Sequence, residues 1–185
     1  DEINLDIGIS CALQCPKCDR ENMFKDIRPI PGHNMSVSEF RKISEHFPKI
    51  IMCGQISDPI FNPNLLEFIK ISKKNNCRLG IYTAASQKQI KWYEECFDNF
   101  GRGRWVFGID GLPKDSHKYR INQDGEKLWE VAKICVSKGI HVEWQYIVFK
   151  YNENDIEEAK KMADDYGIEF NLNVSSRWLG RDDPY

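Results

Sequence analysis

The sequence predicts an α/β fold in which parallel strands form a partial barrel. Two periodicities alternate along the 185 residues: short apolar runs typical of buried strands, and longer segments with apolar residues at helical spacing. This strand–helix unit recurs roughly every 30 residues, the length of a right-handed βαβ crossover. There are six such strands, fewer than the eight of a closed barrel. We therefore predict a partial (β/α)6 TIM-like barrel that forms one domain over residues 1–185.

The individual elements follow from local patterns. The predicted strands are the apolar runs at 3–9, 49–53, 78–83, 105–109, 141–148 and 169–174. Ser36 and Glu39 form a capping box, which predicts the start of the first helix. Apolar stripes predict further helices over 65–72, 90–97, 128–135 and 156–166. Asn154 is expected to start the last of these, and Gly139 to end the helix before it.

Polar residues gather where the predicted strands end. Asp58, Thr83, Asp110 and Gln145 each fall at or near the carboxyl end of a strand. In parallel sheets these ends meet at one edge, and ligands bind there. A loop with three cysteines follows the first strand and is expected at the same edge.

The three cysteines of this loop, Cys11, Cys15 and Cys18, point to a metal centre. Three thiolates this close together can hold three irons of a [4Fe–4S] cluster and leave the fourth iron without a protein ligand. An open iron can bind a small molecule, so the spacing favours a catalytic cluster over an electron-transfer cluster. The alternatives are a redox Cys-x-x-Cys and a structural zinc site, for which His33 is the nearest fourth ligand.

The rest of the composition narrows the class of protein. Net charge is −2 and no stripe of lysine or arginine occurs, so nothing favours binding to nucleic acid or an anionic membrane. No apolar run approaches the roughly 20 residues of a membrane helix. We expect a cytoplasmic protein without disulfides. The remaining cysteines are read as small core residues: Cys53, Cys77, Cys96 and Cys135.

Four segments, in order, resemble motifs of one superfamily. The segment 11–18, Cys-Ala-Leu-Gln-Cys-Pro-Lys-Cys, resembles the cluster motif of the radical S-adenosylmethionine (SAM) superfamily. The segment 54–63 is similar to the Gly-Gly-Glu-Pro motif that follows strand 2, and 108–111 to the Ser-x-Asp-Gly end of strand 4. The segment 117–120, His-Lys-Tyr-Arg, resembles the His-Asp-x-x-Arg of the peptide-modifying branch. The resemblance covers nearly the whole chain.

The resemblance implies a specific chemistry. The amino and carboxylate groups of SAM chelate the open iron, and one electron from the cluster breaks a carbon–sulfur bond of the sulfonium. The resulting 5′-deoxyadenosyl radical abstracts a hydrogen atom from the substrate. A reducing partner such as flavodoxin or ferredoxin supplies the electron. The cofactor carries the difficult step, while the protein orients it and excludes water.

The resemblance also implies a set of SAM contacts. Lys17 stands where an aromatic residue near the adenine is usual, and Ser57 and Asp58 belong to the segment beside the methionyl amine. Gly108 replaces a serine that often contacts the ribose. The matching family position of Arg120 clamps the methionyl carboxylate, and further contacts are expected from Thr83, Asp110, Gln145 and Asn173.

Each of these residues also has an ordinary structural interpretation. Asp58 precedes Pro59 and is typical of a turn, and Arg120 can be a solvated surface residue. Thr83 and Asp110 can simply terminate strands.

Several functions remain open. The leading hypothesis is a radical SAM enzyme acting on a peptide or protein side chain, with one cluster, because the chain ends soon after the last strand. A small heterocycle is the alternative substrate, since Cys18-Asp19 is similar to the Cys-Asp-Thr of 7-carboxy-7-deazaguanine synthases, although Arg20 replaces the threonine. An activase of glycyl-radical enzymes shares the cysteine spacing. A non-catalytic iron–sulfur or zinc module is the last possibility.

Overall fold

The computed structural model describes residues 1–174. Its strands are β1 (Glu2–Leu5), β2 (Lys49–Cys53), β3 (Arg78–Thr83), β4 (Arg102–Gly108), β5 (His141–Val148) and β6 (Glu169–Val174). Its α-helices are α1 (Asp19–Lys25), α2 (Val37–His46), α3 (Leu65–Lys74), α4 (Ile90–Asn99), α5 (Gly125–Ser137) and α6 (Ile156–Asp165). Two short 3-10 helices are η1 (Pro59–Phe61) and η2 (Ser116–Lys118).

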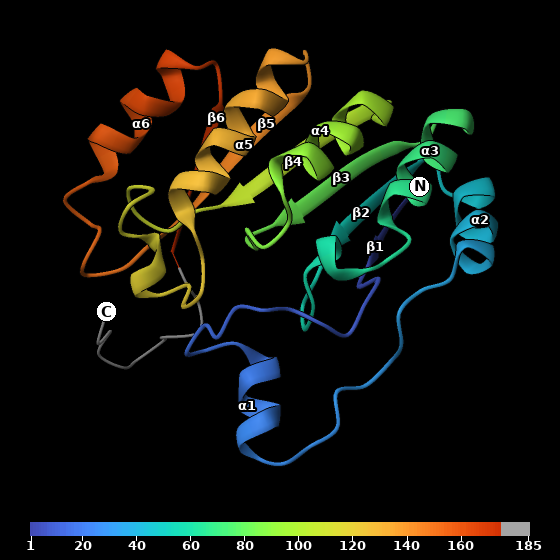
Figure 1. Cartoon of the computed structure of the whole chain (residues 1–185), viewed down its shortest axis with the longest axis horizontal. Helices are drawn as coiled ribbons and strands as arrows, with labels where there is room; N and C mark the ends of the chain where they lie inside the picture. The colour runs from blue at the N-terminus through green and yellow to red at the C-terminus, as the bar shows by residue number, and fades with distance from the viewer. Residues whose placement is uncertain (175–185) are drawn as a thin grey trace.

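The six strands form one parallel sheet in the order β1-β2-β3-β4-β5-β6. Figure 1 shows the helices α3 to α6 along one side of this sheet, each between the two strands that it connects. Within residues 1–174 the two outer strands do not pair with each other, so the sheet stays open. The predicted α/β fold with a parallel, partial barrel is confirmed.

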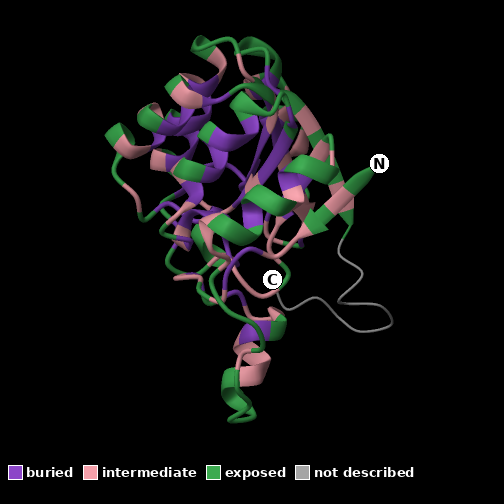
Figure 2. Ribbon diagram, turned by 90° about the vertical axis from the view of Figure 1, so that its right-hand side faces the viewer, coloured by how far each residue is buried: buried purple, intermediate pink, exposed green. Residues whose placement is uncertain are grey.

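Aromatic residues hold the helices against the sheet. The Trp105 ring of β4 lies edge-on to Phe97 of α4, with ring centres 5.1 Å apart. Phe40 and Phe68 stack between α2 and α3 at 4.4 Å. Such rings each bury about 150–250 Å² and dominate core energetics. Figure 2 shows the buried residues concentrated in the strands and the inner helix faces. A rigid core therefore fixes the strand ends that carry the polar residues.

Most element boundaries agree with the sequence prediction, and the exceptions have local causes. The capping box at Ser36 is present, and Gly139 adopts a φ of +75° directly after the C-cap of α5, as predicted. The residue preceding α6 is Asp155, so the prediction of Asn154 is wrong by one position. The first strand stops at Leu5 rather than residue 9, and the next residue, Asp6, accepts backbone N–H groups of the loop that follows β2. Strand β4 spans Arg102–Gly108 rather than the predicted 105–109.

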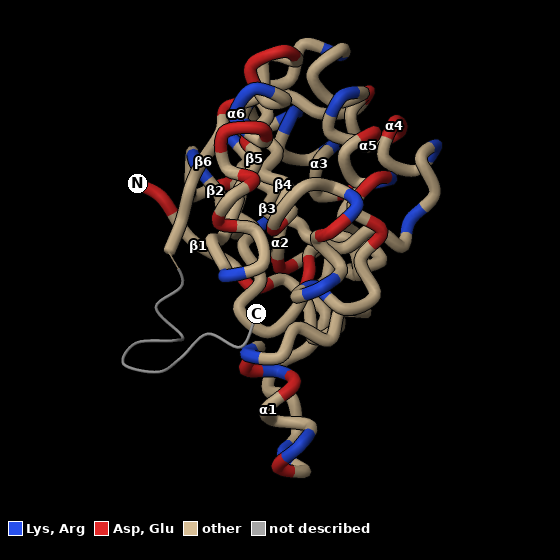
Figure 3. The backbone as a smooth tube through the Cα atoms, turned by 90° about the vertical axis from the view of Figure 1, so that its left-hand side faces the viewer, with Lys and Arg blue, Asp and Glu red and all other residues tan. Residues whose placement is uncertain are grey.

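The helix α1 was not predicted from the sequence. Its seven residues are too few for an apolar stripe, and it lacks a side-chain cap. Figures 1 and 3 show that α1 projects away from the sheet at the end of the cysteine loop. Its carboxyl-terminal side exposes Phe24 and Ile27. No helix within residues 1–174 is both long and apolar enough to cross a bilayer.

Candidate active site at the carboxyl ends of the strands

A cavity of about 380 Å³ lies at the carboxyl ends of the strands. This volume falls within the roughly 300–1,000 Å³ typical of small-molecule sites. The structure brings most of the predicted site residues to its wall: Cys11, Cys15, Cys18, Ser57, Asp58, Thr83, Arg120, Gln145 and Asn173. Lys17 and Asp110 are not among the lining residues, and Asp110 is fully buried behind Arg120.

The cysteine loop is held to the body of the protein by backbone contacts. Leu13 is buried in the core, which fixes the middle of the loop. The backbone N–H of Gln14 donates to the carbonyl of Ile121 at 3.1 Å. The side chain of Asn122 donates to the carbonyl of Ala12 at 3.1 Å. The loop that follows β4 therefore positions the cysteine loop that follows β1.

The cysteines fit an iron–sulfur cluster better than a single zinc ion. None of the seven cysteines, all within residues 1–174, forms a disulfide. Cys11, Cys15 and Cys18 all lie on the wall of one cavity. A set of three thiols can hold three irons of a [4Fe–4S] cluster, whereas a structural zinc site usually has four protein ligands.

The fourth ligand considered for zinc lies elsewhere. His33 is 70% exposed and contacts Glu39 at 2.9 Å. It lines a separate groove beside Asp6 and Gly8 rather than the cysteine cavity. A structural zinc site usually has four protein ligands. The position of His33 therefore does not favour the zinc-knuckle alternative that used this histidine.

Burial raises the pKa of the Cys11 thiol to about 12, and the nearby Asp58 carboxylate adds to the shift. The backbone N–H of Leu13 and the cation of Arg20 act in the opposite direction. Because iron binds the thiolate, metal binding must displace this proton.

The carboxylate of Asp58 is saturated by contacts within the protein. It accepts hydrogen bonds from the Thr83 hydroxyl at 2.8 Å and from the backbone N–H groups of Ala84 and Ala85 at 2.9 and 3.0 Å. The N–H of Ile60 adds a fourth donor at 3.2 Å. A carboxylate has about four acceptor sites, so little capacity remains for a ligand. Burial raises the pKa of Asp58, while these hydrogen bonds oppose the shift.

A second carboxylate shapes the loop before Asp58. Asp6 accepts the backbone N–H groups of Gln55 and Ile56, both at 2.9 Å, and the hydroxyl of Ser57. At Gly54 any Cβ would lie 1.9 Å from the carbonyl oxygen of Ser57, so the turn excludes a side chain there. The loop therefore follows the cavity wall closely, with Ser57 facing the cavity.

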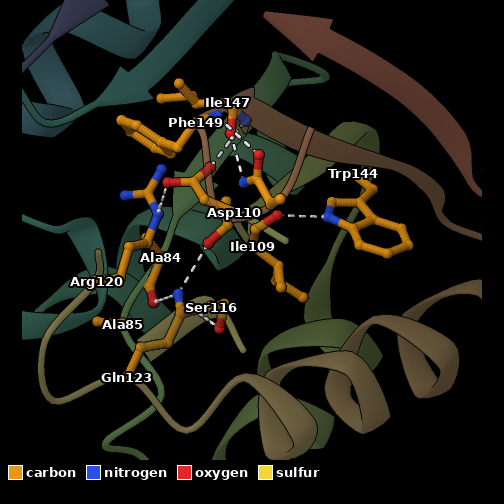
Figure 4. A network of polar contacts seen from close by, with 12 residues as sticks. Ala84, Ala85, Ile109, Asp110, Ser116, Arg120, Gln123, Trp144, Ile147 and Phe149 are labelled. Atoms are coloured by element: carbon orange, nitrogen blue, oxygen red, sulfur yellow. Dashed lines mark hydrogen bonds and ion pairs between the residues drawn. The ribbon is translucent and has the colours of Figure 1, made fainter. Parts of the chain in front are cut away.

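A buried ion pair orients Arg120 (Figure 4). The Nε of Arg120 lies 2.7 Å from Oδ2 of Asp110, whose Oδ1 accepts the backbone N–H of Ile147 at 2.9 Å. Burial raises the pKa of Asp110, and the Arg120 cation opposes the shift. An ideal Cβ at Gly108 would lie 3.0 Å from Nη2 of Arg120. The missing side chain at Gly108 therefore leaves room for the guanidinium at the end of β4.

Gln123 joins the same network to the neighbouring strand. Its amide donates to the carbonyl of Ala84 at 2.6 Å and to that of Gly108 at 2.8 Å. Its oxygen accepts the hydroxyl of Ser116. Figure 4 shows these contacts below the Asp110–Arg120 pair. The ends of β3 and β4 are thus linked by one side chain.

Two functional candidates were missed in the sequence. Cys53, predicted as a core residue, is half-buried and lines the cavity, whereas Cys77, Cys96 and Cys135 are buried as predicted. Its position at the carboxyl end of β2 was the available signal. Arg20 also lines the cavity and is only 5% exposed. In the sequence Arg20 stands out only as the residue that replaces a threonine after Cys18-Asp19, and the burial of a charged side chain beside a loop has no local sequence signal.

Comparison with solved structures finds proteins that share the fold of this chain. The chain superimposes on SuiB of Streptococcus suis with a TM-score of 0.77, 13% identity and 98% of this chain covered. A SuiB structure has S-adenosylmethionine bound. The methionine-derived cofactor is also bound in anSMEcpe, which matches with a TM-score of 0.71, 11% identity and 94% coverage. The chain therefore shares the fold of SuiB and anSMEcpe, both of which have been solved with S-adenosylmethionine bound.

A third neighbour, the methylornithine synthase PylB, has a TM-score of 0.68, 14% identity and 99% coverage of this chain. No protein-family model and no curated protein matches the sequence. The chain spans 41% of SuiB, 49% of anSMEcpe and 57% of PylB. The likeness is therefore one of fold, shared over less than two thirds of each neighbour.

Proposed function

We propose that this chain is a radical SAM enzyme that acts on a peptide or protein side chain. The observation that carries the proposal is the position of the cysteine triplet on the wall of a cavity in a radical SAM fold. When bound, a reduced [4Fe–4S] cluster supplies the electron that cleaves SAM to methionine and a 5′-deoxyadenosyl radical. The chain's own residues hold, orient and enclose these cofactors.

Cys11, Cys15 and Cys18 hold three irons of the cluster in this proposal. Arg120 lines the same cavity, its Nε lies 2.7 Å from Oδ2 of Asp110, and in this proposal its terminal nitrogens are the donors offered to a ligand. A guanidinium binds a carboxylate in bidentate fashion, so Arg120 suits the methionyl carboxylate. Asp110 acts through Arg120 rather than on the ribose directly.

The motif suggests Asp58 as the partner of the methionyl ammonium, and we propose the adjoining loop 54–57 instead. Asp58 already accepts four hydrogen bonds within the protein, so we assign it to holding the ends of β2 and β3 together. Ser57 and the backbone of the 54–57 loop border the cavity beside it. Gln145 and Asn173 lie on the wall formed by β5 and β6 and suit the nucleoside or the substrate.

A peptide substrate is favoured by two observations. SuiB has been solved with its precursor peptide SuiA, and anSMEcpe with a peptide. Within residues 1–174 the sheet is open, with β6 at its edge and Asn173 beside the cavity. An extended substrate can therefore reach the cavity without crossing a closed wall. A flavodoxin or ferredoxin is the proposed source of the electron.

Anaerobic reconstitution with iron and sulfide tests the proposal. The full chain is incubated with SAM and dithionite, and 5′-deoxyadenosine is measured by liquid chromatography. We expect 5′-deoxyadenosine from the wild type and none from Cys15→Ser. A brown, iron-loaded wild type that leaves SAM intact would contradict the enzymatic proposal. The two substrate classes are then distinguished by deuterium transfer. Deuterium appearing in 5′-deoxyadenosine from deuterated peptides is compared with that from deuterated pterins.

A further inference from the structure

Arg20 is a buried cation beside the cysteine triplet. It lies two residues after Cys18, at the start of α1, and only 5% of its surface is exposed. One terminal nitrogen, Nη2, donates to the carbonyl of Leu13 at 2.6 Å and to Oε1 of Glu21 at 2.7 Å. The guanidinium carbon lies 5.2 Å from the centre of the Phe24 ring. These contacts fix the guanidinium on the cavity wall.

One hydrogen-bond donor of Arg20 has no acceptor. Its Nε is buried, and no described residue accepts a hydrogen bond from it. A buried, charged donor without an acceptor is unfavourable, and native proteins rarely leave one unsatisfied. Arg20 lines the same cavity as Cys11, Cys15 and Cys18. An anionic group in the cavity would supply the missing acceptor.

We propose that Arg20 is a positioning residue of the iron–sulfur cluster, which donates a hydrogen bond to cluster or cysteine sulfur and stabilises the reduced state. The inference rests on the proposed function, because it requires a cluster at the cysteine triplet. Hydrogen bonds to sulfur and nearby charge are known determinants of cluster potential. Nothing in the cysteine spacing itself requires this arginine.

The direction of the effect follows from charge. Reduction adds one electron to the cluster, taken from a one-electron reductant such as dithionite, and makes it more negative by one unit. A fixed cation stabilises the reduced form more than the oxidised form, so Arg20 raises the reduction potential. The carboxylate of Glu21, whose side chain is 16% exposed and pairs with Arg20, acts in the opposite direction because its charge is negative.

The two residues therefore give variants of opposite sign. We expect Arg20→Gln to shift the equilibrium tenfold toward the oxidised cluster, about 59 mV lower for a one-electron couple. Glu21→Gln is expected to shift the potential upward, and Arg20→Lys to lie between wild type and Arg20→Gln. Arg28→Gln is the matched control, because Arg28 lies three residues after α1 but is 55% exposed and paired with Asp26.

The measurement is an anaerobic redox titration of the reconstituted full chain, followed by electron paramagnetic resonance. Iron and sulfide are counted for each variant, so a lost cluster is not read as a shifted potential. Potentials that agree for wild type, Arg20→Gln and Glu21→Gln would overturn the inference while leaving the proposed function intact. If Arg20→Gln does not retain its cluster, Arg20→Lys and Glu21→Gln decide. A wild type that binds no cluster contradicts the proposed function itself.

Discussion

The two ends of the sheet carry similar residues but use them differently. At the amino ends, Nη1 of Arg104 lies 2.6 Å from Oε1 of Glu143, and Nε2 of His141 lies 3.1 Å from Oε2 of Glu169. The Arg104 guanidinium also donates to the hydroxyl of Tyr82 at 2.5 Å. These charges therefore find their partners within the protein.

At the carboxyl ends, by contrast, part of the polar chemistry has no protein partner. Arg120 uses its Nε for Asp110, and its remaining N–H groups border a cavity. The buried Nε of Arg20 has no acceptor among residues 1–174, and the cysteine triplet lines the same space. Glu143 and Gln145 show the contrast on one strand, because they point to the same side of β5 only two residues apart, with Glu143 paired to Arg104 and Gln145 on the cavity wall. Paired charges stabilise the fold, whereas a buried donor without an acceptor beside a cavity indicates a candidate ligand site.

Exchanging cysteines at the two ends gives the largest expected effect. Serine at Cys11, Cys15 or Cys18 should reduce bound iron from about four per chain to near zero, because serine replaces a thiolate ligand. Cys77 lies at the amino end, where its thiol donates to the carbonyl of Phe47 at 3.1 Å, so Cys77→Ser should retain the iron. Iron analysis after anaerobic reconstitution measures both. Loss of iron in Cys53→Ser would instead identify a fourth ligand and contradict the open iron.

Neutralising one carboxylate at each end of the sheet should lower the free energy of unfolding more for a buried ion pair than for a partly solvated one. Asp110→Asn leaves the Arg120 cation, 15% exposed, without a counter-charge, and breaking such a pair costs about 3–5 kcal/mol. Glu143→Gln leaves Arg104, which is 36% exposed and reached by water, so we expect about 1 kcal/mol or less. Urea unfolding of the cofactor-free chain gives both values. Equal losses at the two ends would contradict the comparison.

Adding one methyl group at each end gives a smaller effect. In Gly108→Ala the new Cβ lies 3.0 Å from Nη2 of Arg120, which Asp110 prevents from moving freely. We expect SAM to bind about tenfold more weakly, or about 1.4 kcal/mol, in equilibrium dialysis with the reconstituted protein. Gly80→Ala is the matched control near the amino end, where the Cβ meets Ile51 at 3.3 Å. Unchanged affinity in Gly108→Ala would show that Arg120 does not contact the ligand.

A carboxylate away from both ends provides the smallest effect and a reference. Hydrogen bonds from Ser36 lower the pKa of Glu39 from its usual 4.5 to about 2. Because the folded-state pKa is the lower one, the ionised form stabilises α2 above about pH 4.5, and this contribution is lost as pH falls toward 2. We expect the difference in unfolding free energy between wild type and Glu39→Gln to shrink over that range. A difference that grows on acidification would contradict the assigned cap.

Local patterns in the sequence were sufficient for much of the fold. Strand and helix periodicity is a property of neighbouring residues, so β2, β3, β5 and β6 were predicted with their observed bounds. The projecting helix α1 was missed, because seven residues carry too little periodic signal. The first strand was predicted too long, since Asp6 takes the N–H groups of a distant loop instead of continuing the sheet.

The sequence by itself determined the cysteine spacing, the parallel α/β order and the edge at which polar residues gather, because each depends on positions close together in the chain. Only the tertiary structure decided which of those groups remain available to a ligand. Asp58 accepts a hydrogen bond from Thr83, 25 residues away in the chain, and Asp110 forms an ion pair with Arg120. Arg20 and Cys53, by contrast, lie on the cavity wall. Partners are chosen by strand order and packing, which bring together residues that no local pattern relates.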